Sequence, residues 1–110
     1  MSSLGYQEDQ PTRADIDLLA GETVLEFGAN WRGICRAATP EIDDALAGRP
    51  GLRRIKIADG KGRPLGRSFR VKLWPTLILL RDGAEVGRLV RPRDRSAVTA
   101  ALAEAGFGSR

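Results

Sequence analysis

The sequence predicts an α/β fold in which a central mixed sheet of about four strands is flanked by helices, in the order α-β-α-β-α-β-β-α. Two observations support this prediction. Strand-like and helix-like apolar patterns alternate along the first two thirds of the chain, which is typical of crossover connections between parallel strands. Later, an Asp-Gly pair at Asp82 and Gly83 separates two apolar runs and indicates an antiparallel hairpin.

The N-terminal part of the chain predicts a disordered segment followed by a helix. Residues 1–10 are mostly polar, so we expect them to be disordered and a single domain to occupy residues 11–110. Thr12 is suited to cap a helix that carries Ile16 on its apolar side, and Gly21 is suited to end it.

Two strands and a long helix follow. Thr23–Ala29 is short and contains β-branched and aromatic residues, as strands do. Gly33–Ala47 has apolar residues near a 3.6-residue period, and Pro40 inside it is expected to kink the helix. Residues 52–58 alternate apolar and basic side chains, which predicts a strand that buries its apolar residues.

The second half of the chain predicts a short helix, a hairpin and a closing helix. The glycine-rich and basic segment Asp59–Val71 is expected to hold a short helix at Leu65–Phe69. Thr76–Leu80 is a buried strand, Glu85–Val90 is its hairpin partner, and Asp94–Ala105 is the last helix.

Charge and composition exclude several classes of function. The 110 residues include 18 Lys and Arg against 14 Asp and Glu, but acidic residues are interspersed among the basic ones and few aromatic residues are available to stack on bases. We therefore expect a solvated cationic surface and no nucleic-acid partner. The N-terminus lacks a secretory signal and the apolar run Leu73–Leu80 is too short to span a bilayer, so we expect a cytoplasmic protein without a membrane partner.

The chain contains no histidine and a single cysteine. Catalytic pairs with a histidine base and metal sites with histidine or several thiolates are thereby excluded, so we expect neither a metal nor a cofactor. The glycines of residues 59–66 lack the spacing of a phosphate-binding loop. The abundance of Ala, Gly and Arg is compatible with a bacterial source.

The segment Glu26–Cys35, EFGANWRGIC, places the only cysteine where a strand runs through a turn into a helix. Such an arrangement is typical of a redox site, because a helix N-terminus favours a thiolate. A dithiol site requires a second sulfur three residues earlier, however, and that position holds Arg32.

These motifs resemble the thioredoxin family over about residues 12–106. Trp31, Gly33 and Cys35 match the family's Trp-Cys-Gly-Pro-Cys segment, and Pro40 matches the proline that kinks its active-site helix. VKLWPTLILLRDG, residues 71–83, resembles the segment that contains the family's cis-proline, which would be Pro75.

The resemblance implies a role for each matched position. Cys35 takes the position of the resolving cysteine, Glu26 that of the buried carboxylate that accepts its proton, and Arg32 that of the attacking cysteine. Because a guanidinium is not a nucleophile at neutral pH, the chain alone is not expected to complete the reduction of a disulfide.

Departures from the family pattern are expected to cluster on the surface that receives a partner peptide. They are Arg32, Ile34, Trp74 and Arg91, while Glu26 replaces an aspartate beneath that surface. Together with Trp31, Gly33 and Pro75 these surface residues are the predicted binding face, and the two arginines favour an acidic protein or peptide partner.

Three alternatives for Arg32 remain open from sequence: it favours a docked anion, pairs with Glu26, or stabilises a Cys35 thiolate. Cys35 itself is either an inert core residue or a single-cysteine redox centre that forms mixed disulfides and relies on an external thiol such as glutathione. Trp31 and Phe27 also suit ordinary packing roles.

Overall fold

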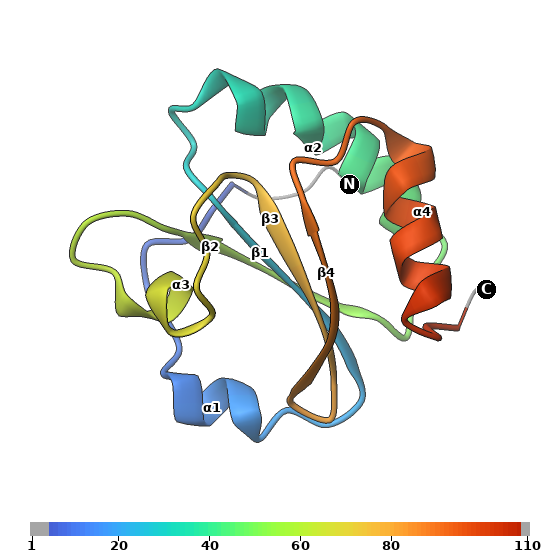
Figure 1. Cartoon of the computed structure of the whole chain (residues 1–110), viewed down its shortest axis with the longest axis horizontal. Helices are drawn as coiled ribbons and strands as arrows, with labels where there is room; N and C mark the ends of the chain where they lie inside the picture. Colours follow the sequence, from blue (N-terminus) through green and yellow to red (C-terminus); the bar gives the residue numbers. More distant parts are fainter. Residues whose placement is uncertain (1–4, 109–110) are drawn as a thin grey trace.

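The sheet of the protein has four strands in the spatial order β2-β1-β3-β4, as seen in the computed structural model, which describes residues 5–108 (Figure 1). β1 pairs in parallel with β2, and the pairs β1–β3 and β3–β4 are antiparallel. The elements in chain order are α1 (Arg13–Asp17), β1 (Glu22–Gly28), α2 (Gly33–Leu46), β2 (Arg53–Ala58), α3 (Pro64–Ser68), β3 (Thr76–Arg81), β4 (Ala84–Val90) and α4 (Arg95–Glu104). The predicted fold class is thereby confirmed.

Both faces of the two central strands are buried. Val24 and Leu79 pack with Ile42 of α2 and Leu102 of α4 in one apolar cluster. Leu25, Phe27, Ile78 and Leu80 pack on the opposite face with Ile16 of α1, Leu65 of α3 and Phe69, which directly follows α3. Successive residues of β1 therefore alternate between two cores, as expected for a sheet covered by helices on both sides.

The helix α2 continues through Pro40 and packs against α4 on the same face of the sheet (Figure 1). Its N-cap residue is Arg32, which is extended and makes no side-chain capping bond. The buried side of α2 consists of Cys35, Ala38, Ile42 and Ala45, at helical spacing.

The hairpin turn between β3 and β4 agrees with the Asp-Gly prediction. Asp82 and Gly83 have φ values of 51° and 83°, the left-handed values that such a two-residue turn requires. The turn also contacts α1, because a Cβ at Gly83 would lie 2.1 Å from the Asp17 carbonyl oxygen. Only glycine fits both the backbone angle and this close approach.

Residues 1–10 were expected to be disordered, but residues 5–10 are ordered. Residues 1–4 lie outside the described part of the chain. Gln7 forms a parallel bridge to β2, donating from its N–H to the Lys56 carbonyl oxygen at 3.0 Å and accepting from the Ala58 N–H at 2.9 Å. Tyr6 is 5% exposed. Backbone pairing at the edge of β2 and an aromatic anchor thus order this segment, although its composition is polar.

Between residues 5 and 108, no helix is long and apolar enough to cross a membrane.

Candidate functional site

Two tryptophans and an arginine form a cluster at the N-terminus of α2. The rings of Trp31 and Trp74 meet edge to face with their centroids 6.0 Å apart. The guanidinium carbon of Arg32 lies 5.5 Å from the Trp31 ring centroid and 5.6 Å from the Trp74 ring centroid. At these distances the ring faces attract the cation. We call Trp31, Arg32 and Trp74 the indole–arginine cluster.

The cluster is accessible from solvent. Trp31 is 69% exposed and the nearby Ile34 is 39% exposed. Gly33 is also exposed, and Arg32 is half-buried against the two rings. Three of the four consecutive residues Trp31–Ile34 are therefore exposed at the start of α2.

The Trp74–Pro75 peptide bond is cis, and the loop that contains it is held from several sides. Arg91 donates from its backbone N–H to the Pro75 carbonyl oxygen at 2.8 Å and from its side-chain Nε to the Trp74 carbonyl oxygen at 2.8 Å. Trp74 Nε1 donates to a carboxylate oxygen of Asp59 at 2.9 Å. Pro75 is buried, and Arg91 braces the loop with its backbone N–H and its guanidinium.

Cys35 is a free thiol with no solvent exposure. It packs with Tyr6, Ala58 and Trp74 beneath the start of α2. Because thiol reactivity requires access as well as a thiolate, the thiol in this position cannot be attacked without movement of its neighbours.

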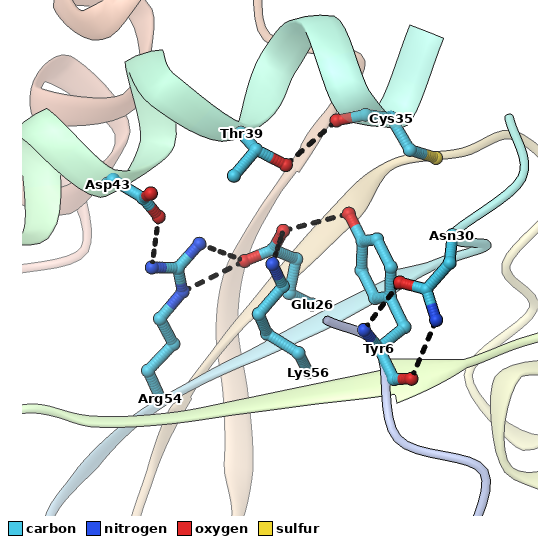
Figure 2. A network of polar contacts seen from close by, with 8 residues as sticks. All are labelled: Tyr6, Glu26, Asn30, Cys35, Thr39, Asp43, Arg54 and Lys56. Carbon is cyan, nitrogen blue, oxygen red and sulfur yellow. Dashed lines mark hydrogen bonds and ion pairs between the residues drawn. The ribbon is translucent and has the colours of Figure 1, made fainter. Parts of the chain in front are cut away.

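Glu26 is fully buried, and both of its carboxylate oxygens have donors (Figure 2). Arg54 donates to one oxygen from Nε at 3.0 Å and from a terminal nitrogen at 2.7 Å. The Tyr6 hydroxyl donates to the other oxygen at 2.9 Å, with Lys56 Nζ 4.0 Å away. Arg54 also pairs with Asp43 of α2 at 2.7 Å. We call Tyr6, Glu26, Asp43, Arg54 and Lys56 the polar network.

The network answers one question that the sequence left open. The partner of Glu26 is Arg54, while Arg32 lies against the two indole rings on the surface. Glu26 and Lys56 are directly paired across β1 and β2, and residues two apart on a strand share a face, so Arg54 points the same way. Two carboxylates and two cations thereby compensate one another where burial of a single charge would be costly.

Tyr6 joins the network to the cysteine. Burial, followed by the charge of Glu26, raises the pKa of the Tyr6 hydroxyl far above its usual value, and the adjacent Cys35 thiol adds to this effect. Tyr6 therefore remains protonated and continues to donate to Glu26. Burial lowers the pKa of Lys56 despite the attraction of Glu26.

The backbone around Tyr6 explains how its ring enters the core. Asn30 accepts from the Tyr6 N–H at 2.8 Å and donates to its carbonyl oxygen at 3.1 Å, as Figure 2 shows. A Cβ at Gly28 would lie 2.6 Å from the ring, so the glycine makes room for it. Tyr6 thus occupies a place shaped by β1 and by the turn before α2.

Sequence reasoning missed Tyr6, Arg54 and Lys56. The apolar residues of β2 were assigned to its buried side, but Lys56 on the other side is also buried, with 7% exposure. A signal was available in the pairing of the predicted strands, because basic residues on the strand next to a buried glutamate can compensate its charge.

Comparison with known proteins agrees with this geometry. The family model described as thioredoxin matches residues 9–104. A thioredoxin of Chlamydia pneumoniae is 33% identical over 85 residues, which cover 77% of this chain and 83% of the relative. Thioredoxin 2 of Pseudomonas aeruginosa, solved in its reduced form, superposes with a TM-score of 0.84 at 45% identity, covering 96% of this chain and 98% of the other. A thioredoxin of Nicotiana alata superposes with a TM-score of 0.70 at 25% identity, covering 84% and 80%.

Proposed function

This chain belongs to the thioredoxin family, and from that premise we propose that it does not catalyse disulfide reduction with a dithiol. Its proposed function is to bind a protein partner through the indole–arginine cluster. The observation that carries the proposal is the environment of Arg32. Its guanidinium lies beside both indole rings, at the sequence position to which the resemblance assigns the attacking sulfur, while the only cysteine is fully buried.

The chemistry of disulfide reduction supports the first half of the proposal. Reduction by a dithiol needs one thiolate to attack the substrate disulfide and a second thiol to release it from the mixed disulfide. A guanidinium performs neither step. Cys35 supplies one sulfur, and a buried thiol is a poor attacking group.

The shape and charge of the cluster support the second half. Trp31 and Ile34 offer exposed apolar surface, and Arg32 adds a cation that is already partly desolvated by the rings. Exposed aromatic residues with arginine are the side chains enriched in protein interfaces. A peptide that carries both apolar and acidic residues is therefore the partner that fits this surface.

Reduction of insulin in the presence of dithiothreitol tests the first half. The wild-type protein is expected to leave the background rate unchanged. Arg32→Cys restores a Cys-Gly-Ile-Cys segment and is expected to raise the rate by about tenfold or more, because both sulfurs are then present. The double variant Arg32→Cys with Cys35→Ser is the control that should lose this gain. Rapid reduction by the wild-type protein would overturn the proposal.

Fluorescence anisotropy with a labelled eight-residue peptide of alternating glutamate and leucine tests the second half. Arg32→Ala is expected to weaken binding about fivefold, as the loss of a partly desolvated charge contact does. Arg95→Ala removes an exposed arginine of α4 and serves as the matched control that should bind normally. Affinity that is equal at low and high salt would contradict a role for the arginine.

The free thiol of Cys35 favours a second candidate function, single-cysteine redox chemistry. In this reaction the Cys35 thiolate attacks the disulfide of oxidised glutathione, a mixed disulfide forms, and one glutathione thiolate leaves; a further external thiol then reverses the step. Mass spectrometry after incubation with oxidised glutathione decides between the two. We expect an adduct only in denaturant, whereas a rapid adduct in the native protein would favour the redox function.

We also propose a reducing compartment, the bacterial cytoplasm, as the location of the protein. A free thiol is the usual state of cysteine in that compartment. Fractionation of cells that express the tagged full chain tests this location.

A further inference from the structure

A hollow of about 480 Å³ lies on the outer surface between the segment 59–63, the helix α3 and the segment 70–74. Its lining is strongly basic and includes one indole. The side chains concerned are Lys61, Arg63, Arg67, Arg70, Lys72 and Trp74. Lys61, Arg63, Arg67 and Arg70 belong to the glycine-rich basic segment Asp59–Val71, and Lys72 follows it directly. Trp74 is shared with the indole–arginine cluster, whereas the five cations are not part of the binding face described above.

Little negative charge balances this lining. Asp59 is the acidic residue in the hollow, and one of its oxygens accepts a bond from Trp74 at 2.9 Å. Arg63 is neutralised by an ion pair with Glu8. Within residues 5–108, the other four cations of the hollow make no ion pair, so their charge faces solvent together.

The backbone places Arg67 and Arg70 on one tight turn. Arg70 adopts a left-handed φ of 59°, which is unfavourable for a residue with a side chain. Its N–H donates to the Arg67 carbonyl oxygen at 2.9 Å, and the Val71 N–H donates to the Gly66 carbonyl oxygen at 2.9 Å. The tight turn after α3 thus brings two cations to the same rim despite their mutual repulsion.

We propose that this hollow binds a small molecule with a polyphosphate chain, such as a nucleoside triphosphate. Its volume falls within the range of about 300–1,000 Å³ that is usual for small-molecule sites. Several cations that converge from separate segments match a compact and multiply charged anion better than an extended chain. Trp74 supplies an aromatic surface on which a base can pack. The proposal depends on neither Cys35 nor a protein partner.

Isothermal titration calorimetry with sodium triphosphate and with ATP tests the proposal on the full chain. The variant Arg67→Gln with Lys72→Gln removes two cations of the hollow. The control Arg93→Gln with Arg95→Gln removes the same charge from exposed positions elsewhere. We expect the dissociation constant to rise about tenfold or more in the first variant and less than about twofold in the control, since charge-assisted contacts are lost only in the first.

The two ligands distinguish the source of the affinity. If the wild-type protein binds ATP more tightly than triphosphate, and Trp74→Phe binds the two ligands equally, a nucleoside ligand is supported. If the wild-type protein binds both ligands equally, recognition of the polyphosphate chain alone is supported. Three results would overturn the proposal: no saturable binding, equal weakening in both double variants, or tighter binding of a hexaglutamate peptide. Circular dichroism melting curves establish that the variants are folded.

Discussion

Tyr6 is the only tyrosine of the chain, so alkaline titration of the native protein follows a single buried hydroxyl. Burial and the charge of Glu26 raise its pKa above the usual 10.0, and we expect the folded protein to show no tyrosinate absorbance near that pH. Tyrosinate should appear only when the protein unfolds. The perturbation is thus a rise of pH from 8 to about 12, with Tyr6→Phe as the reference variant.

The sign and size of the effect follow from proton linkage. Above pH 10.0 the unfolded chain loses the tyrosine proton while the folded chain retains it, so this group stabilises the fold fully below pH 10.0 and progressively less above it. The loss is about 1.4 kcal/mol for each pH unit. At neutral pH the bond to Glu26 should make the wild type about 1.5–3 kcal/mol more stable than Tyr6→Phe. The two stabilities should therefore meet about one to two pH units above 10.

Urea unfolding at a series of pH values measures the difference, and absorbance at 295 nm follows the tyrosinate. The comparison with Tyr6→Phe is needed because other groups titrate in this range. Burial lowers the pKa of Lys56, for example, and this works in the opposite direction. A tyrosinate signal with a midpoint near 10, appearing while the far-ultraviolet circular dichroism remains native, would refute the reasoning.

Three further predictions concern stability, each measured by urea unfolding. Arg54→Met leaves the buried Glu26 without its main partner and should cost about 3–5 kcal/mol; a loss below about 1 kcal/mol would show that the pair is dispensable. Arg70→Gly relieves a left-handed φ and should raise stability by up to about 1 kcal/mol while weakening triphosphate binding, whereas a drop in stability would contradict the strain. Gly83→Ala should destabilise by well over about 1 kcal/mol, because it combines an unfavourable φ with the close Asp17 carbonyl; a neutral outcome would mean that the turn relaxes freely.

Local sequence signals were sufficient to predict the order of the helices and strands. The Asp82–Gly83 turn was predictable because a two-residue hairpin requires left-handed residues, and Asp-Gly is a favoured pair there. The start of α1 was predictable because Thr12 caps it and accepts from the Asp15 N–H. These features depend on neighbours in the chain, which a sequence displays directly.

The candidate site was predictable only in part. The surface positions Arg32 and Trp74 could be brought together through a resemblance, yet the approach of the guanidinium to both indoles depends on side-chain conformations that no pattern encodes. Tyr6 was missed because its burial comes from backbone pairing at the edge of β2, a contact about 50 residues distant in sequence. The Glu26 partners likewise depend on the strand register.

Because Cys35 is buried against Tyr6 and Trp74, its reaction with a thiol reagent reports local opening of the native structure. A small thiol reagent can reach Cys35 only when α2 or one of these rings moves away from it. Displacement of the Tyr6 ring also breaks the bond of its hydroxyl to Glu26. When opening and closing are fast, the ratio of the labelling rate in the native protein to that in the unfolded chain is the population of the open state. The free energy of a local excursion can therefore be followed at a single atom, in the wild-type protein and without an introduced probe.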